Sequence, residues 1–463
     1  FDLRNGQDTT IRASITNMTP GRHTSINESE VSASLEYVKK PEVIFGEANG
    51  TRSMSREQAM SDHDLNSTTV TIKLPKNAVS GDKLTVTIKE PNEATAREIK
   101  YTIGKDNNGK FFVKDSDGNK IDTETDGRSF KVSGIKTATG LETKVTAEIK
   151  DKDGIQHAED TSTVTISNIN DMAVYFKEDA DRNVSLTRAE SKDSDGDLHK
   201  TTVVVKVPNN VIVGDVVTVK IDNGTSPKTY KVTGRDPSGK IMLEDTSTHN
   251  SITASDKNEI EIPGVEIIAG KTINVTTETT DASGGKKAEA QNHNTLETLN
   301  NDMKITFDED SDNDGILYNA EANRDHNEDT TTATIKLPSN FVLGDKLIVE
   351  SHNEDTPNNK TTKTYEIVKD NNGKLIAKNG SEELDITDDA DGNKVVKYTL
   401  GLTEDHKTII NAKVTDNTGA DKVETNSDIT LDAQGSGSGT GFRLFIDEDK
   451  DRNGVLSRDE AID

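Results

Sequence analysis

Residues 310–321, DSDNDGILYNAE, carry oxygen-bearing side chains at a spacing that can surround a metal ion. Carboxylates stand at the first, third and fifth positions of this loop, glycine at the sixth and glutamate at the twelfth. Alternate carboxylates on a tightly wound loop converge on one point, and the glycine permits the sharp turn. Ca²⁺ takes six to eight oxygens at about 2.3–2.6 Å, so this spacing predicts a calcium site. The predicted ligands are Asp310, Asp312, Asp314, Ile316 through its carbonyl, and Glu321.

Two further stretches keep most of this pattern, and a third keeps little of it. Residues 449–460, DKDRNGVLSRDE, retain the glycine, and their predicted ligands are Asp449, Asp451, Asn453, Val455 and Glu460. Residues 179–190, DADRNVSLTRAE, have Val184 where the glycine should be, so we expect weaker binding there. The predicted ligands of that loop are Asp179, Asp181, Asn183, Ser185 and Glu190. Residues 47–58, EANGTRSMSREQ, end in Gln58 instead of an acid, and we interpret them as a solvated turn without an ion.

Other acidic residues flank the loops. Those that follow a loop could supply a second ion site, but solvated turns are the favoured interpretation for Asp62, Asp64, Asp193, Asp195, Asp197, Asp325 and Asp329. Two Asn-Asp-Met junctions contain acids that could reach a neighbouring domain, Asp171 and Asp302. Two acids stand just ahead of their loops, Asp308 and Asp447.

The composition favours cations as partners. The chain has 463 residues with 83 acidic and 56 basic side chains, a net charge of −27, which argues against nucleic acid and anionic membranes. Hydrophobic residues make up 30% and tryptophan is absent, so we expect small cores without the aromatic-lined cleft of a glycosidase. Histidine pairs at metalloprotease spacing and glycine-rich phosphate loops are also missing, and an enzyme is not predicted. The chain contains no cysteine, so calcium could supply the cross-links that disulfides give other secreted proteins.

A long internal repeat organises the chain. The segments 72–88, 205–221 and 335–351 each contain an apolar strand, a proline, an asparagine and a Gly-Asp pair. Phe45, Phe176 and Phe307 align with a period of 131 residues in both steps, 176 − 45 and 307 − 176. A period of this length indicates whole domains in tandem.

The period predicts six segments. Residues 1–42 match the last strands of a preceding domain, and residues 442–463 match the first strand and calcium loop of a following one. A Gly/Ser linker occupies 435–441. Complete repeats are expected at 43–172, 173–303 and 304–434.

Within one repeat the pattern is that of short strands. Val, Ile and Thr alternate with polar residues, Gly, Asn, Asp and Pro separate the runs, and long amphipathic helices are absent. The predicted fold class is therefore all-β, with tandem β-sandwich domains and a calcium loop near the start of each.

The motif KLPxNxVxGDxLTV, together with DxDxDG loops at domain starts, resembles the extender region of large bacterial adhesins secreted by type I systems. That resemblance covers essentially the whole chain and implies calcium-rigidified immunoglobulin-like modules, an extracellular location on the bacterial surface, and a role in attachment or biofilm formation. The chain lacks the nonapeptide repeats of that family's secretion end, and residues 47–58 depart from its loop pattern.

We therefore expect a structural extender whose partners are calcium ions and its own neighbouring repeats, while another region binds the distal ligand. Calcium would remove like-charge repulsion at the junctions and tie several backbone segments to one ion. The alternatives are a module that itself binds a glycan or a protein, and an accessory region of a secreted carbohydrate-active enzyme.

Overall fold

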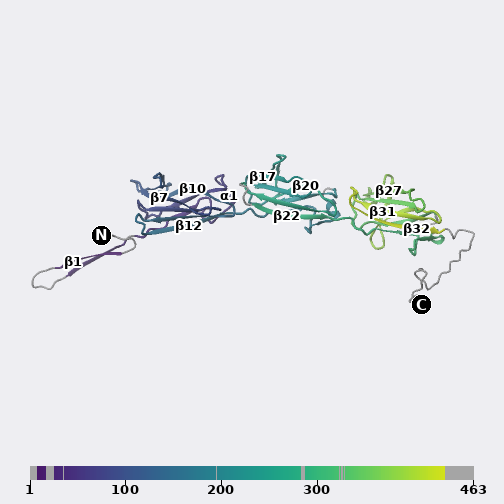
Figure 1. Ribbon diagram of the computed structural model, residues 1–463, viewed down its shortest axis with the longest axis horizontal. Coiled ribbons are helices and arrows are strands. Elements are labelled where there is room, and N and C mark those ends of the chain that lie inside the picture. Colours follow the sequence, from purple (N-terminus) through teal and green to yellow (C-terminus); the bar gives the residue numbers. More distant parts are fainter. Residues whose placement is uncertain are drawn as a thin grey trace, which may run out of the picture. The chain divides into compact units, whose positions relative to one another are not determined.

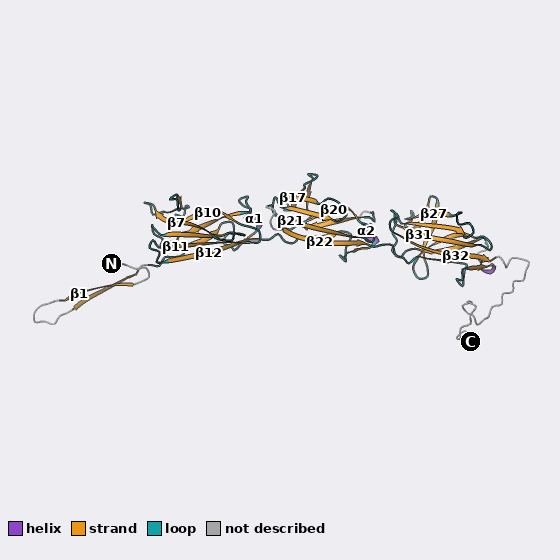
Figure 2. Cartoon of the chain, in the orientation of Figure 1, coloured by secondary structure: helices purple, strands orange, loops and turns teal. Residues whose placement is uncertain are grey.

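The computed structural model describes residues 8–16, 26–34, 36–193, 196–282, 287–322, 324, 327 and 329–432. Strands joined by short turns make up nearly all of this part of the chain (Figure 1, Figure 2). It divides into two compact units. Unit one comprises Phe1–Tyr175, Val203–Ile262 and Asn274–Asn292, and unit two comprises Phe176–Thr202, Pro263–Ile273 and His293–Asp463. We call the sequence repeats 43–172, 173–303 and 304–434 repeats one, two and three; their limits stay predictions.

A two-stranded hairpin precedes repeat one. Strands β1 (Asp8–Thr16) and β2 (Ile26–Ser34) are antiparallel and in register from Asp8↔Ser34 to Thr16↔Ile26. Two apolar side chains of this hairpin are largely exposed, Ile15 at 75% and Val31 at 63%. This arrangement suits the last two strands of a domain, which is what the sequence predicts for residues 1–42.

Repeat one forms two sheets around one core. The first sheet has the order β10-β5-β3 and the second the order β4-β12-β11-β6-β7-β8-β9. Its elements are β3 (Glu42–Phe45), β4 (Ser53–Met54), α1 (Arg56–Ala59), β5 (Ser67–Lys73), β6 (Lys83–Lys89), β7 (Arg97–Lys105), β8 (Phe111–Lys114), β9 (Lys120–Asp122), β10 (Ser129–Lys136), β11 (Glu142–Lys150) and β12 (His157–Ile166).

Repeat two has the same sheet orders, β13-β15-β20 and β14-β22-β21-β16-β17-β18-β19. Its elements are β13 (Ala173–Phe176), β14 (Ser185–Leu186), α2 (Arg188–Asp193), β15 (Lys200–Lys206), β16 (Val216–Ile221), β17 (Lys228–Arg235), β18 (Ile241–Asp245), β19 (Ser251–Thr253), β20 (Glu259–Glu266), β21 (Thr272–Thr280) and β22 (Lys287–Leu296).

In repeat three the two sheets join into one of ten strands, because β29 pairs with both β28 and β30. Its elements are β23 (Lys304–Phe307), β24 (Ile316–Tyr318), α3 (Asn319–Ala322), β25 (Thr330–Lys336), β26 (Lys346–Asn353), β27 (Thr361–Lys369), β28 (Leu375–Asn379), β29 (Glu382–Asp388), β30 (Lys394–Gly401), β31 (Lys407–Thr415) and β32 (Lys422–Asp432).

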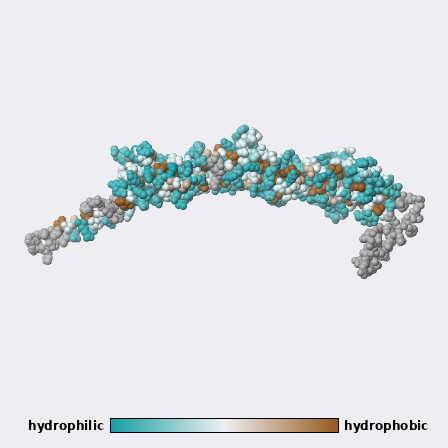
Figure 3. Space-filling model, in the orientation of Figure 1, coloured by the Kyte–Doolittle hydropathy of each residue, from teal (hydrophilic) through white to brown (hydrophobic). Residues whose placement is uncertain are grey.

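Period-two alternation explains these strands. Along β5 and β6 every second side chain is buried, and Ile72 and Val86 from the two sheets belong to one core cluster with Phe45. The other face of each strand is polar and partly exposed, which is what a strand covered on one side requires. Hydrophilic residues accordingly cover most of the face seen in Figure 3. The predicted all-β sandwich class is confirmed. Among the described residues, no helix is long and apolar enough to span a membrane.

One turn recurs in all three repeats. After the proline, the amide N–H groups of Val79, Ile212 and Val342 donate to the second carboxylate oxygens of the Gly-Asp aspartates at 2.9 Å in each case. Each glycine has positive φ, from 90° to 105°. This turn buries its aspartate almost completely; the three residues are Asp82, Asp215 and Asp345.

Candidate calcium loops and repeat-to-repeat contacts

The loop at residue 310 brings three carboxylates together between β23 and β24. One oxygen each of Asp310, Asp312 and Asp314 lies within 4.8 Å of the others. Asp310 is 6% exposed, whereas the other two face solvent. The three predicted carboxylate ligands thus converge on one point, as their i, i+2, i+4 spacing predicts.

Backbone hydrogen bonds hold this loop in its turn. The amides of Asp314 and Gly315 donate to the two carboxylate oxygens of Asp310 at 3.2 and 3.0 Å. Gly315 has φ +79°, the left-handed region that glycine enters without steric cost. The amide of Thr430 donates to the carbonyl of Gly315 at 3.0 Å, so β32 supports the loop from the core side. Ile316 begins β24 and pairs in parallel with Thr430, and its role as a carbonyl ligand stays a prediction.

Glu321, from the short helix α3, reaches back to the start of the loop. Its Oε1 accepts hydrogen bonds from the hydroxyl of Ser311 at 2.7 Å and from the amide of that residue at 3.3 Å. Its Oε2 is buried and has no hydrogen-bond partner within the described residues. A buried carboxylate oxygen without a donor is costly unless a cation neutralises it, so this residue suits the role of closing ligand.

The electrostatics of the loop favour a cation. Burial raises the pKa of Asp310, and the nearby carboxylates of Asp314 and Asp312 raise it further, against the two backbone hydrogen bonds that lower it. Protonation or a bound cation would relieve this repulsion. At neutral pH a divalent cation does so while keeping all the carboxylates available as ligands.

The loop at residue 179 has the same backbone construction. The amides of Asn183 and Val184 donate to the two carboxylate oxygens of Asp179 at 3.1 and 3.2 Å, as their counterparts do in the loop at 310. Val184 has φ +64° and is 39% exposed, so a β-branched residue occupies the left-handed conformation of Gly315. The turn forms despite the valine, and the expected resistance takes the form of backbone strain.

The remaining predicted ligands at 179 differ in their contacts. Asp181 and Asn183 are joined by a side-chain hydrogen bond of 2.8 Å, and the amide of Ser185 donates to Asn183 Oδ1 at 2.8 Å. Glu190 accepts from the amide and the hydroxyl of Thr187 at 3.0 and 2.8 Å. Glu190 therefore caps the start of α2, and its role as an ion ligand stays a prediction.

Sequence reasoning missed Asn294, a fully buried side chain of β22. Its amide donates to Asp179 Oδ2 at 2.7 Å, and its own Oδ1 has no partner within the described part of the chain. The β14–β22 and β24–β32 pairings align this position with Ile429 of repeat three. An asparagine at an apolar strand position was the available signal.

The structure corrects the alignment of the loop at 47. The Thr68 hydroxyl donates to Glu47 at 2.8 Å, and in the later repeats the matching threonines donate to Glu178 and Glu309. Glu47 therefore corresponds to the glutamate before each loop, and Ala48 takes the first ligand position. That loop is one residue shorter than the others and lacks the leading carboxylate, and its interpretation as a turn without an ion stays a prediction.

This comparison reveals a second group that the sequence reasoning missed. Glu178 and Glu309 are 7% and 6% exposed and precede the first ligand of their loops. Each also accepts from a backbone amide on the facing strand, Thr202 at 2.9 Å and Thr332 at 3.0 Å. An acid directly before each first ligand was the signal, and its role is to tie the loop to the core.

Several flanking acids have partners in the structure. Asp308 pairs with Lys397 of its own repeat at 2.6 Å. Asp302, near the end of repeat two, accepts from the amide of Ser339 in repeat three at 3.1 Å, so this junction acid reaches the neighbouring repeat. Asp64 and Asp197 accept from nearby backbone amides, as in a turn. Residues 449–460 lie outside the described residues, so their predicted site stays a prediction.

A buried ion pair joins repeat one to repeat two within unit one. Arg56, the first residue of α1, donates from Nη2 to Asp215 Oδ1 at 2.6 Å and from Nη1 to Thr139 Oγ1 at 3.2 Å. The Arg56 and Asp215 side chains are each 0% exposed. Ile212, three residues before this aspartate, packs in the core cluster of repeat one. The acceptor is the aspartate of the Gly-Asp turn.

The same contact recurs within unit two. Arg188, at the start of α2, donates from Nη2 to Asp345 Oδ1 at 2.7 Å and from Nη1 to Asp421 Oδ2 at 2.9 Å. Arg188 is fully buried, and Asp421 also accepts from the amide of Leu299 at 2.8 Å. Arg56 and Arg188 stand three residues after Ser53 and Ser185, so they occupy one place in the loop-to-helix segment. Sequence reasoning missed both pairs.

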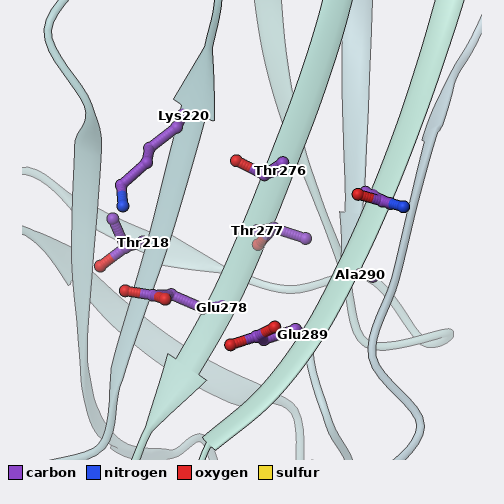
Figure 4. Close-up of a pocket in the computed structure, with 8 residues that line it drawn as sticks. Thr218, Lys220, Thr276, Thr277, Glu278, Glu289 and Ala290 are labelled. Carbon is purple, nitrogen blue, oxygen red and sulfur yellow. The ribbon is translucent and has the colours of Figure 1, made fainter.

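A polar hollow lies on one face of β16, β21 and β22 (Figure 4). Its lining includes Thr218, Lys220, Thr276, Glu278 and Glu289 and contains no aromatic side chain. Nearby Lys287 pairs with Glu278 at 3.2 Å and with Glu289 at 2.8 Å. The hollow offers charged and hydroxyl groups without an apolar floor, which suits water better than a small organic ligand.

Comparisons with known proteins show similarity in structure only. No family model matches the chain, and no curated protein matches it. A tetra-tandem repeat from the extending region of a large adhesion protein is 13% identical, with a TM-score of 0.30, over 91% of this chain and 81% of that one. The FN1–FN3 domains of chicken CNTN1 are 8% identical, with a TM-score of 0.22, over 85% and 99%. Escherichia coli alpha-2-macroglobulin activated by porcine elastase is 11% identical, with a TM-score of 0.18, over 92% and 36%.

We predict that Val184→Gly stabilises the protein by about 1 kcal/mol, because glycine removes the strain of a β-branched residue at positive φ. The same substitution should also increase the calcium affinity of the loop at 179. Urea denaturation and calcium titration measure the two effects. Val213→Gly is the matched control, an exposed valine outside the positive-φ residues, and it should destabilise. Equal effects of the two substitutions would contradict the strain argument.

The pKa of Asp310 predicts opposite pH effects with and without calcium. Because burial raises that pKa above its unfolded value, protonation of Asp310 favours the calcium-free fold, and this stability is lost as pH rises through the folded pKa. With calcium bound, acidification displaces the ion and lowers stability. The measurement is the melting temperature of the native chain minus that of Asp310→Asn, between pH 7 and pH 4. The same sign of slope in both conditions would refute this reasoning.

Arg188→Ala should lower the free energy of unfolding by about 3–5 kcal/mol, because it leaves Asp345 and Asp421 without their counter-charge. Urea denaturation gives the value. Arg12→Ala removes an exposed pair with Glu30, and we expect at most about 1 kcal/mol there. A loss at Arg188 no larger than at Arg12 would show that the buried pair does not hold the junction.

Proposed function

We propose that this chain is a calcium-stabilised extender of a bacterial surface adhesin, in which the ions are structural. The observation that carries the proposal is the convergence of Asp310, Asp312 and Asp314 within 4.8 Å on a loop near the start of a repeat. Hard oxygen donors of this kind, on a turn held by backbone amides, suit Ca²⁺ better than a transition metal.

The position of the loops supports a structural role. The segment 179–190 contains both the predicted ligands and Arg188, whose guanidinium pairs with Asp345 of repeat three inside unit two. An ion that orders the loop would therefore also order the arginine two residues before Glu190. Through this coupling, calcium binding in one repeat would strengthen its attachment to the next.

The adhesin assignment rests on the sequence motifs. The Gly-Asp strand motif, the DxDxDG loops and the cysteine-free acidic composition resemble extender regions of large bacterial adhesins. An extender holds a distal binding domain away from the cell, which implies an extracellular location and a contribution to attachment or biofilm formation. The role needs no chemical reaction, so we do not propose an enzyme.

A ligand-binding module is the second candidate, and the hollow on β16, β21 and β22 gives it a place (Figure 4). Its polar lining could hydrogen-bond a glycan. The lack of an aromatic platform there weighs against this candidate, because aromatic side chains supply much of the contact area in binding pockets.

Calcium titration calorimetry tests the site. Asp310→Ala combined with Asp312→Ala should reduce the number of bound ions by one, because it removes two converging carboxylates. Asp62→Ala combined with Asp64→Ala is the matched control, since Asp62 and Asp64 accept hydrogen bonds from their own turn, and it should leave the stoichiometry unchanged. Undiminished binding in the Asp310 variant would refute the assignment.

Small-angle scattering separates the two candidate functions. For an extender, millimolar calcium should increase the maximum dimension and reduce the conformational spread relative to the chelated protein. For a ligand-binding module, chelation should change the scattering little. The Asp310 and Asp312 double variant should respond less than the native chain does.

A further inference from the structure

In repeats two and three, the buried aspartate of the Gly-Asp turn binds an arginine side chain. In both, the oxygen that accepts is Oδ1 of the buried aspartate, and the donor is Nη2 of an arginine from the loop-to-helix segment of the preceding repeat. The two distances, 2.6 and 2.7 Å, are those of charge-assisted hydrogen bonds. Asp215 and Asp345 are 0% and 1% exposed, so each carboxylate requires the positive charge of its arginine.

Repeat one has the same turn, but among the described residues no arginine pairs with its aspartate. Asp82 is 1% exposed, and its Oδ2 accepts from the amide of Val79 as in the other repeats. Its Oδ1, the oxygen that receives arginine elsewhere, is buried without a hydrogen-bond partner among the described residues. Burial raises the pKa of Asp82 and Asp151 raises it further, against the backbone amides of Val79 and Lys152, which lower it.

A second acid accompanies each of these aspartates. Asp151, Asp281 and Asp416 are 9%, 5% and 0% exposed, and each opposes ionisation of the Gly-Asp carboxylate of its own repeat. Two buried carboxylates at one site repel each other, so the binding of a cation there is favourable. The two occupied examples show that the cation is a guanidinium group.

The segment that leads into repeat one lies as the other two junction segments do. Asn77 donates from its side chain to the carbonyl of Tyr37 at 2.7 Å, Asn210 to Asn168 at 2.7 Å, and Asn340 to Thr298 at 2.8 Å. The amide of Val38 donates to Gln156 as the amide of Leu299 does to Asp421. The segment before repeat one thus makes the same kinds of polar contact with its repeat as the other two junction segments make with theirs.

The turn that contains Asp82 also lacks an apolar contact that the turn of repeat two makes. Ile212 is 6% exposed because it packs in the core cluster of repeat one, whereas Val79, at the same position of its own turn, is 54% exposed. Within the described part of the chain, this one place therefore lacks both a charge partner for Asp82 and an apolar neighbour for Val79.

We infer that the end of repeat one containing Asp82 and Val79 is a docking surface for another repeat of this kind, which inserts its loop arginine onto Asp82 Oδ1. Arginine fits because its guanidinium stays charged when buried and donates in a fixed geometry. The inference rests on the proposed tandem extender but not on calcium: the first test below would succeed even if the loops held no ion.

The first experiment compares three substitutions in the full chain by hydrogen–deuterium exchange with peptide mass spectrometry. Asp215→Asn and Asp345→Asn remove the partner of a buried arginine, so exchange in β16 and in β26, respectively, should accelerate at least about tenfold. Asp82→Asn removes an unpaired charge and keeps an acceptor for Val79, so exchange in β6 should stay equal or slow. Acceleration in β6 as large as in the other two strands would overturn the inference.

The second experiment adds a preceding repeat that carries the arginine. Residues 1–34 of the full chain are replaced by a further copy of residues 43–165, so that the junction segment keeps its register. In this longer chain Asp82→Asn should accelerate exchange in β6 at least about tenfold, because Asp82 now carries a partner. Changing the added copy's counterpart of Arg56 to asparagine should abolish that effect. An Asp82→Asn effect that is the same with arginine and with asparagine in the added copy would overturn the proposal.

Discussion

The structure depends on the neutralisation of carboxylates that are buried away from water. Asp310 is 6% exposed and surrounded by other carboxylates, while Asp215 and Asp345 are buried at the Gly-Asp turns. A carboxylate removed from water is unfavourable unless it is neutralised or hydrogen-bonded. The chain meets this requirement at the turns with arginine, and we propose that it does so at the loops with calcium.

The two kinds of counter-charge are linked by the covalent chain. Within twelve residues, the segment 179–190 carries the ligand-bearing loop, the two-residue strand β14 and the start of α2 with Arg188. The parallel pairing of Ser185 and Leu186 with β22 anchors the middle of this segment on the sheet. Because only a few residues separate the loop from Arg188, ordering of the loop would also restrict the position of the arginine without a long-range rearrangement.

The sandwich supplies rigidity with few large side chains. Its cores contain mainly Val, Ile and Leu at alternate strand positions, with Phe45, Phe176 and Phe307 at the strands that lead into the loops. A small core leaves the ends of each repeat to be stabilised by polar contacts. That is where the buried arginines lie, and where the unpartnered oxygen of Asp82 stands.

The sequence by itself determined the all-β sandwich and the carboxylates of the loop at 310, because period-two alternation and i, i+2, i+4 spacing are local properties. Only the tertiary structure decided the rest. Arg56 and Asp215 are 159 residues apart and Arg188 and Asp345 are 157, so no local pattern could pair them. The register of Glu47 differs from these pairs, because the 131-residue period that aligns Phe45 with Phe176 also aligns Glu47 with Glu178, and the hydrogen bond from Thr68 agrees with that alignment. Whether a buried charge has a partner depends on which distant segments the fold brings together, and spacing along the chain does not contain that information.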